Sequence, residues 1–276
     1  DRAYSSWSLR GWPLFDAFGI PVKLHTARLY TDELPTLLKS FFPGKTAPTM
    51  RTPDGVVVPE TIAIAEELAS RHPEAGIWPT DPKARAVARV LAAEMHAGFS
   101  ALRNHCPMNL RVSYTDCAPP DAVLADLARL ETIWAWAKQQ TGSKVWLCGT
   151  YSAADAFFAP VAARIAGYNL PVSAAAMDYV NAQLAHNSFR RWRAIGMIDG
   201  ADQAYYRRDY PLRSWPGPAP LPARAVEGMQ SENAACPYSG DPVTHVLELN
   251  GRRFGFCNAF CRDKTVADPE AWPKFI

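Results

Sequence analysis

The chain has 276 residues, of which 48% are hydrophobic and 20% are charged, a balance typical of globular domains with a sizeable core. Its 29 basic and 27 acidic residues leave a net charge of +2, which excludes the strongly basic surface expected of a protein that binds nucleic acid or an anionic membrane. No apolar run approaches the length of a membrane span. Six cysteines are too few for a disulfide scaffold, so a reduced, cytoplasmic setting is predicted.

The first part of the chain mixes helical and strand patterns. In chain order we predict a helix over 7–18 that ends at Gly19, a strand over 21–25, a helix from residue 32, a loop over 44–50 that enters a strand, a hairpin turn at Asp54-Gly55 before a strand over 56–58, and a helix over 60–69. This order predicts a thioredoxin-like α/β domain over residues 1–75. Its first strand would lie just before Asp1.

A helical pattern follows a linker at 72–79 that is rich in proline and glycine. From residue 83 to residue 200 the apolar side chains recur at helical spacing without strand signals, which predicts an all-helical second domain. We expect helices near 83–106, 119–141, 153–167, 173–186 and 188–195. Ser152 and Asp155 stand three residues apart ahead of an apolar run, so each side chain is expected to bond the other residue's amide in a capping box.

The last part of the chain is predicted to hold an arm and a small module. Residues 201–230 carry several prolines that preclude a regular helix, so we expect an extended surface arm held by aromatic side chains: Tyr205, Tyr206, Tyr210 and Trp215. In residues 231–276, two strand patterns flank Asn250-Gly251, which predicts a β-hairpin. A module of this size needs a staple or a docking surface to be stable.

Three serines lie near the start of the first predicted helix, in the stretch from Tyr4 to Arg10. A serine at a helix start can cap the helix, because its oxygen accepts an orphan amide. It can equally donate a hydrogen bond to an anion such as a thiolate. The residues alone leave both roles open.

Several motifs together resemble the soluble glutathione transferases of the serine type, as found in bacteria and in the zeta and tau classes. The resemblance covers about residues 1–200 and rests on motifs in the family's order: the serine stretch, Ala47-Pro48 at the place of a cis-proline, Glu60-Thr61 at the start of a helix, Gly76 to Pro79 as interdomain linker, and the Ser152–Asp155 capping box. It implies a glutathione transferase that conjugates, isomerises or cleaves a small electrophile, and it implies a homodimer.

The resemblance assigns roles at the glutathione site. Ser5 aligns with the catalytic serine, which would stabilise the thiolate of glutathione, and Ser6 is the second candidate. Ser8 is expected to serve only as a cap, and Arg10 as a structural residue. The other expected contacts are Trp7 beside the bound substrates, the backbone at Ala47 and Pro48 with the tripeptide, Glu60 with its ammonium, Thr61 with its γ-glutamyl carboxylate and Lys45 with its glycyl carboxylate. For Lys45 an exposed surface lysine is an equal alternative.

The acceptor substrate is expected between Trp7 and the first helix of the helical domain. His96, Phe99 and Arg103 lie on one face of that predicted helix and are the candidate contacts. For Phe99, packing in the core is the favoured alternative.

The last 41 residues hold three cysteines, Cys236, Cys257 and Cys261, around the predicted hairpin. They resemble the YHS type of small metal-associated domain, and thiolates suit zinc or another soft divalent metal. A fourth ligand would be needed, with His245 the first choice and Asp263 the second. Free thiols and a redox disulfide remain open alternatives. A second function is therefore also open, a non-catalytic module that binds glutathione or metal.

Overall fold

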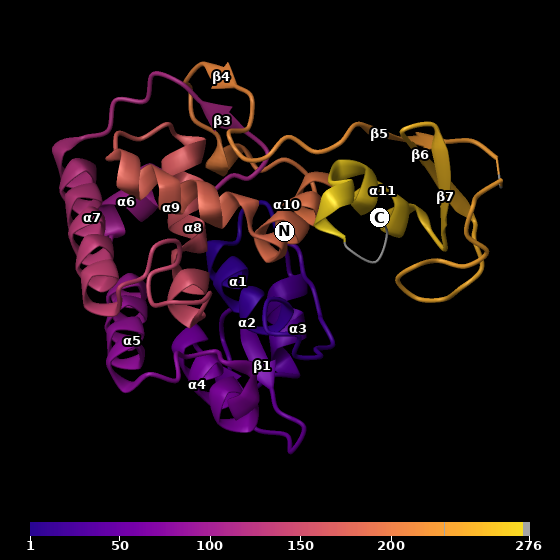
Figure 1. Ribbon diagram of the computed structural model, residues 1–276. Helices are drawn as coiled ribbons and strands as arrows, with labels where there is room; N and C mark the ends of the chain where they lie inside the picture. Colours follow the sequence, from indigo (N-terminus) through magenta and orange to yellow (C-terminus); the bar gives the residue numbers. More distant parts are fainter. Residues whose placement is uncertain (229, 273–276) are drawn as a thin grey trace.

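The computed structural model describes residues 1–228 and 230–272. An α/β layer is followed by a helical domain, and a small module projects from one side of the helical domain (Figure 1). Within the described residues, no helix is both long enough and apolar enough to cross a membrane.

The α/β layer is built from short elements. These are α1 (Ser6–Gly11), α2 (Pro13–Asp16), α3 (Glu33–Lys39), β1 (Thr49–Arg51), β2 (Val57–Pro59) and α4 (Thr61–Arg71). The first predicted helix is divided at Trp12, because Pro13 has no amide hydrogen to continue the ladder. β1 and β2 pair antiparallel with Met50 opposite Val58, across the predicted turn at Asp54-Gly55, where Gly55 has a φ of 91°.

The strand expected over 21–25 is not present. The segment is extended and exposed, but no described residue pairs with it as a strand. Extended backbone becomes a strand only where a neighbour completes the hydrogen-bond ladder, and alternating side chains do not supply that neighbour. The first strand expected before Asp1 stays a prediction.

The second domain consists of six helices within the described residues. They are α5 (Pro82–Ala97), α6 (Ser100–His105), α7 (Asp121–Thr141), α8 (Ala153–Gly167), α9 (Ala174–Ala185) and α10 (Asn187–Ile198). The prediction of one continuous helix over 83–106 was wrong, because the structure has two helices there. The helical stretch breaks at Gly98 and Phe99, because Phe99 has a φ of 59° and leaves the right-handed helical region.

α8 lies at the centre of this domain, with every one of its residues buried. The predicted capping box is confirmed at its start, where Asp155 accepts the Ser152 amide at 2.9 Å. Asp155 also accepts the Leu147 amide at 3.2 Å and the Tyr179 hydroxyl at 3.0 Å. Burial raises the pKa of Asp155 to about 6, although these hydrogen bonds act to lower it. The box therefore fixes both the start of α8 and the loop before it.

The arm from residue 201 crosses the helical domain. Its strand β4 (Leu212–Arg213) pairs with β3 (Ser113–Tyr114) in the loop after α6. Trp215 stacks near Phe189 with ring centroids 6.5 Å apart, and the Arg193 guanidinium lies 4.4 Å from the Trp215 ring centre. These contacts hold the arm on α10.

The C-terminal module is larger than the predicted hairpin. It contains β5 (Ala223–Val226), β6 (His245–Leu249), β7 (Arg252–Phe256) and α11 (Ala259–Ala267). β5 comes from the proline-rich stretch and completes a three-stranded sheet in the order β5-β6-β7. α11 was not predicted, although Asn258 marks its start by accepting the Cys261 amide at 2.8 Å.

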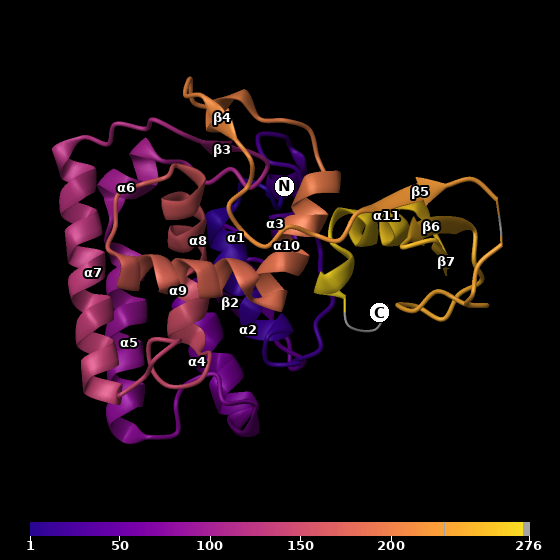
Figure 2. The same cartoon turned by 45° about the horizontal axis from the view of Figure 1, so that its top comes forward.

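The module docks on α10, and both views place α11 beside that helix (Figures 1 and 2). Ala194 and Ile195 of α10 share an apolar cluster with the module. Arg190 of α10 donates to Asp268 at 2.6 Å, and both side chains are mostly buried. This is the docking surface that a module of this size requires.

Candidate functional site

Ser5 lies at the N-terminus of α1 and is half-buried. Its oxygen accepts the Ser8 amide at 3.3 Å, and its hydroxyl donates to the Ser8 oxygen at 2.8 Å. Ser5, rather than Ser8, is therefore the capping residue, because only the residue before the first helical turn can reach the free amides. Ser6 is the first residue of the helix and is also half-buried.

The Ala47-Pro48 bond is cis, as predicted. Pro48 lies against α1, since a Cβ added to Gly11 would come within 2.9 Å of the Pro48 Cγ. Glycine at this position lets the helix approach the proline ring closely. Lys45, two residues before Ala47, is exposed.

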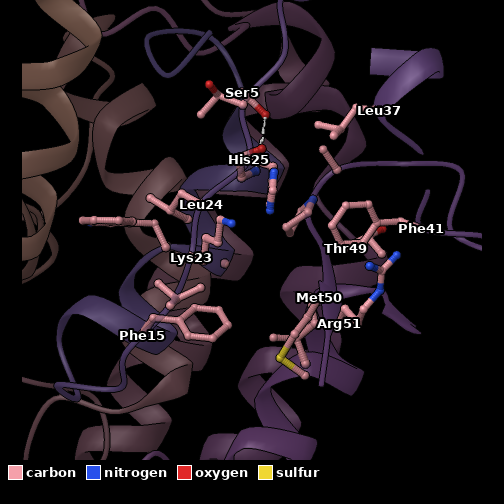
Figure 3. A pocket seen from close by; sticks show the side chains of 18 of the residues that line it. Ser5, Phe15, Lys23, Leu24, His25, Leu37, Phe41, Thr49, Met50 and Arg51 are labelled. Carbon is pink, nitrogen blue, oxygen red and sulfur yellow. Dashed lines mark hydrogen bonds between the residues drawn. The ribbon is translucent and has the colours of Figure 1, made fainter. Parts of the chain in front are cut away.

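A cavity of about 510 Å³ lies on one side of α1. Figure 3 shows Ser5 at one end of it, bonded to Ser8, with Lys23 and Leu24 on one wall and Thr49 and Met50 on the other. Its two walls are the extended segment that includes 21–25 and the free edge of β1.

Glu60 and Thr61 lie at the junction of β2 and α4. Glu60 has a φ of 69°, which an L-residue seldom adopts, and such strain clusters at ligand sites. The Thr61 side chain is buried, and its hydroxyl has no hydrogen-bond partner among the described residues. Most buried polar side chains in proteins have a hydrogen-bond partner, so this hydroxyl marks a position where the described residues supply none.

Trp7 is the centre of a cluster that joins the two domains. Its ring centre lies 5.2 Å from that of His96 and 4.8 Å from the Arg103 guanidinium. His96 in turn lies 3.4 Å from the Glu60 carboxylate. Burial, with Arg10 and Arg103, lowers the pKa of His96, and Glu60 opposes this. The structure thus brings Trp7, His96 and Arg103 together.

The other candidate on this part of the chain, Phe99, lies elsewhere. Its side chain is 6% exposed and belongs to the hydrophobic core at the break between α5 and α6. It shares no common helix face with Arg103, because the helix does not continue through it. Phe99 therefore packs in the core, which was the favoured alternative to a substrate contact.

Arg10 is the residue whose surroundings the sequence did not predict. Its side chain is fully buried, and none of its three guanidinium nitrogens has a hydrogen-bond partner among the described residues. The guanidinium stacks 4.2 Å from the centre of the Trp7 ring. Burial, with the charges of Arg164 and Arg103, lowers its pKa to about 9. A cation–π contact contributes up to about 2 kcal/mol, whereas burying an ion costs several kcal/mol, so Trp7 only partly offsets the burial.

The three C-terminal cysteines come together as predicted. The sulfurs of Cys236, Cys257 and Cys261 lie within 4.8 Å of one another, and all three thiols are free. Burial acts to raise the pKa of Cys236, but hydrogen bonds from backbone amides and from Ser239 bring it down to about 7. Burial is the main cause that raises the pKa of Cys261 to about 12.

Neither proposed fourth ligand joins this group. His245 Nδ1 lies 2.9 Å from the Thr244 hydroxyl, and Asp263 pairs with Arg262 at 2.7 Å. The described residues therefore offer three thiols and a fourth position open to an outside ligand.

Residues 4–71 match the family model described as glutathione S-transferase, N-terminal domain. A curated relative, named "Probable maleylacetoacetate isomerase" of Caenorhabditis elegans, is 32% identical over 105 residues, which are 37% of this chain and 49% of the relative. The chain thus spans about half the length of this relative.

Two solved structures are similar over most of their length. A glutathione transferase homolog from Burkholderia, solved with bound glutathione, has a TM-score of 0.53 at 20% identity over 72% of this chain and 95% of its own. Glutathione transferase Omega 3C from Trametes versicolor has a TM-score of 0.53 at 18% identity over 73% and 87%. At these identities the likeness establishes the fold, a thioredoxin-like domain followed by a helical domain, as predicted.

The unpaired charge of Arg10 gives a testable prediction. Arg10→Met keeps the length of the side chain and removes the buried cation, so we expect the free energy of unfolding to rise by roughly 1–4 kcal/mol. Urea denaturation at pH 7 measures the change. Arg129→Met, at an exposed arginine that pairs with Glu94, is the matched control and should change stability by less than about 1 kcal/mol. A loss of stability in Arg10→Met would show that Arg10 has a partner that offsets its burial.

Proposed function

We propose that this chain, which carries a glutathione S-transferase N-terminal domain at residues 4–71, is a glutathione transferase whose Ser5 hydroxyl stabilises the thiolate of glutathione. The observation that carries the proposal is the position of Ser5. It caps α1 and lines the same cavity as the cis Ala47-Pro48 pair. A free thiol has a pKa of about 8.5, so a hydrogen bond to the charged form is the simplest means of lowering it.

The proton of Ser5 has to change partner in this mechanism. At present the Ser5 hydroxyl donates to Ser8, while its oxygen holds the Ser8 amide. A hydroxyl has one donor and two acceptor positions, so Ser5 can keep the amide and turn its hydrogen toward a sulfur. Ser8 then loses an incoming hydrogen bond, which water can replace because Ser8 is only half-buried. Ser6 is the alternative donor.

The rest of glutathione is proposed to bind along the edge that these residues share. The tripeptide backbone would pair with Ala47 beside Pro48. The free Thr61 hydroxyl and the amides at the start of α4 suit the γ-glutamyl carboxylate, and Glu60 suits its ammonium. Lys45, exposed near the cis-proline, is the candidate for the glycyl carboxylate.

A small electrophile is proposed to bind beside Trp7, where His96 and Arg103 lie. The reaction is conjugation, isomerisation or thiolytic cleavage, and one curated relative is named an isomerase. We also propose a homodimer that acts in the cytoplasm, as the resemblance to glutathione transferases implies.

Replacement of Ser5 tests the proposal. Ser5→Ala should lower kcat/KM with glutathione and chlorodinitrobenzene by roughly ten- to a hundredfold, since it removes a hydrogen bond to a charged atom. Binding of glutathione, measured by calorimetry, should change little. Ser8→Ala is the control on the same helix and should retain most of the activity.

Two results would overturn this assignment. Full activity in Ser5→Ala together with a loss in Ser6→Ala would assign the role to Ser6. A parent chain that binds glutathione but turns over no electrophile would favour a non-catalytic glutathione-binding module.

A second function is favoured by the three thiols within 4.8 Å. We propose that Cys236, Cys257 and Cys261 bind one soft divalent metal ion, zinc in the simplest case, with the fourth position filled from outside the described residues. The donor set fits, because Cys236 has a lowered pKa and Lys264 lies close enough to act on the charges of all three cysteines. Such an ion would staple the strands of the module to α11.

Elemental analysis of the purified chain tests the metal site. About one zinc per chain is expected, with most of it lost in Cys257→Ser and retained in Cys117→Ser, a half-buried cysteine elsewhere in the chain. If no metal is found and Cys236, Cys257 and Cys261 all react with a thiol reagent, the three cysteines are free thiols and the metal site is rejected. A bond between Cys257 and Cys261, seen by mass spectrometry of the unreduced chain, would instead assign a redox pair.

A further inference from the structure

Two arginines lie against the Trp7 ring beside the proposed acceptor position, and the charge of a third acts on one of them. Arg10 and Arg103 both lie within 5 Å of the centre of the Trp7 ring, at 4.2 and 4.8 Å. Arg164, buried in α8, is the third, and its charge and that of Arg103 act on Arg10. They come from α1, α6 and α8, so the fold assembles the group and no single helix displays it.

Within the described part of the chain, no carboxylate forms an ion pair with any of the three. Arg164 donates to two carbonyl oxygens, of Cys106 at 2.8 Å and Pro160 at 3.2 Å, and Arg103 donates to the Gly98 carbonyl at 3.3 Å. Arg10 has no hydrogen-bond partner at all among these residues. Neutral carbonyls satisfy donors but leave the charge uncompensated.

The arginine group is accessible at one edge. Arg103 and Trp7 are half-buried, so both reach solvent where the helical domain meets α1. Glu60, the acidic residue that contacts this cluster, lies against His96 instead. A ligand that enters beside Trp7 therefore meets the Arg103 guanidinium, with the buried Arg10 stacked on the same ring. A guanidinium binds planar oxyanions through two parallel hydrogen bonds.

We infer that the acceptor substrate carries an anionic oxygen group, of which a carboxylate is the simplest, and that this group binds Arg103 beside Trp7, with the buried charge of Arg10 adding to the attraction. The inference rests on the proposed function for the identity of the site as an acceptor site. The electrophilic centre of the substrate would lie toward Ser5, and its anionic end toward the helical domain. An uncharged apolar electrophile would leave the arginines unpaired and should be the poorer ligand.

The test compares two ligands that differ in one charge. Binding of dinitrobenzoate and of dinitrobenzamide, neither of which has a leaving group, is measured by calorimetry on the full chain with saturating glutathione. The parent should bind the benzoate on the order of tenfold more tightly than the amide. Arg103→Gln and Arg10→Met should each remove most of this preference. Arg129→Gln, the same change at an exposed arginine of α7, should keep it.

The corresponding substrates give a kinetic readout. We compare kcat/KM for chlorodinitrobenzoate with kcat/KM for its amide. In Arg103→Gln and in Arg10→Met this ratio should fall by about the same factor as the binding preference does. Equal binding of benzoate and amide by the parent, or an unchanged preference in both arginine variants, would overturn the inference.

Turnover and binding preference together distinguish a failure of the proposed function from a failure of this inference. If both proposals hold, Ser5→Ala should turn over both chlorodinitro compounds roughly ten- to a hundredfold less efficiently and keep the preference for dinitrobenzoate. A parent that shows the preference but no turnover would retain the anion site and reject the transferase proposal.

Discussion

The position of α1 between the two domains is the constraint on which the candidate site depends. One face of this short helix packs against α8, and Gly11 lets it approach the cis-proline at Pro48. The residue before the helix, Ser5, is thereby fixed beside the cis-proline loop, while Trp7 is turned toward α5 and α6. A hydroxyl that is to stabilise a thiolate must be held in this way, because a hydrogen bond is effective only over a narrow range of distance and angle.

The sequence predicted directly the parts of the structure that depend on local chemistry. The capping box of Ser152 and Asp155 belongs to this kind, because a spacing of three residues specifies it, whereas the cis bond before Pro48 was implied by the resemblance. The contact of Trp7 with His96 followed from the resemblance, which supplied the arrangement of the domains. What could not be predicted depended on tertiary neighbours: the buried, unpaired Arg10 has no local signal, since an arginine within a helix is ordinarily exposed.

The errors have the same origin. The strand over 21–25 has the right alternation but no described neighbour to pair with, and the helix over 83–106 ends early because Phe99 turns out of the helix into the core. In the C-terminal module, β5 and α11 form on surfaces that the module and α10 supply. The cysteines were predicted to converge and do so, whereas His245 contacts the Thr244 hydroxyl and lies outside the group.

The central claim, that Ser5 lowers the pKa of the glutathione thiol, is tested most directly by titration of the bound thiolate. Its ultraviolet absorbance is recorded against pH for glutathione bound to the parent and to Ser5→Ala. Free thiol titrates at about 8.5, and one hydrogen bond to the charged form should lower the apparent pKa by about one unit or more in the parent. In Ser5→Ala it should return toward the free value. Titration of parent-bound glutathione at the free value, or at the same lowered value in both proteins, would contradict the claim.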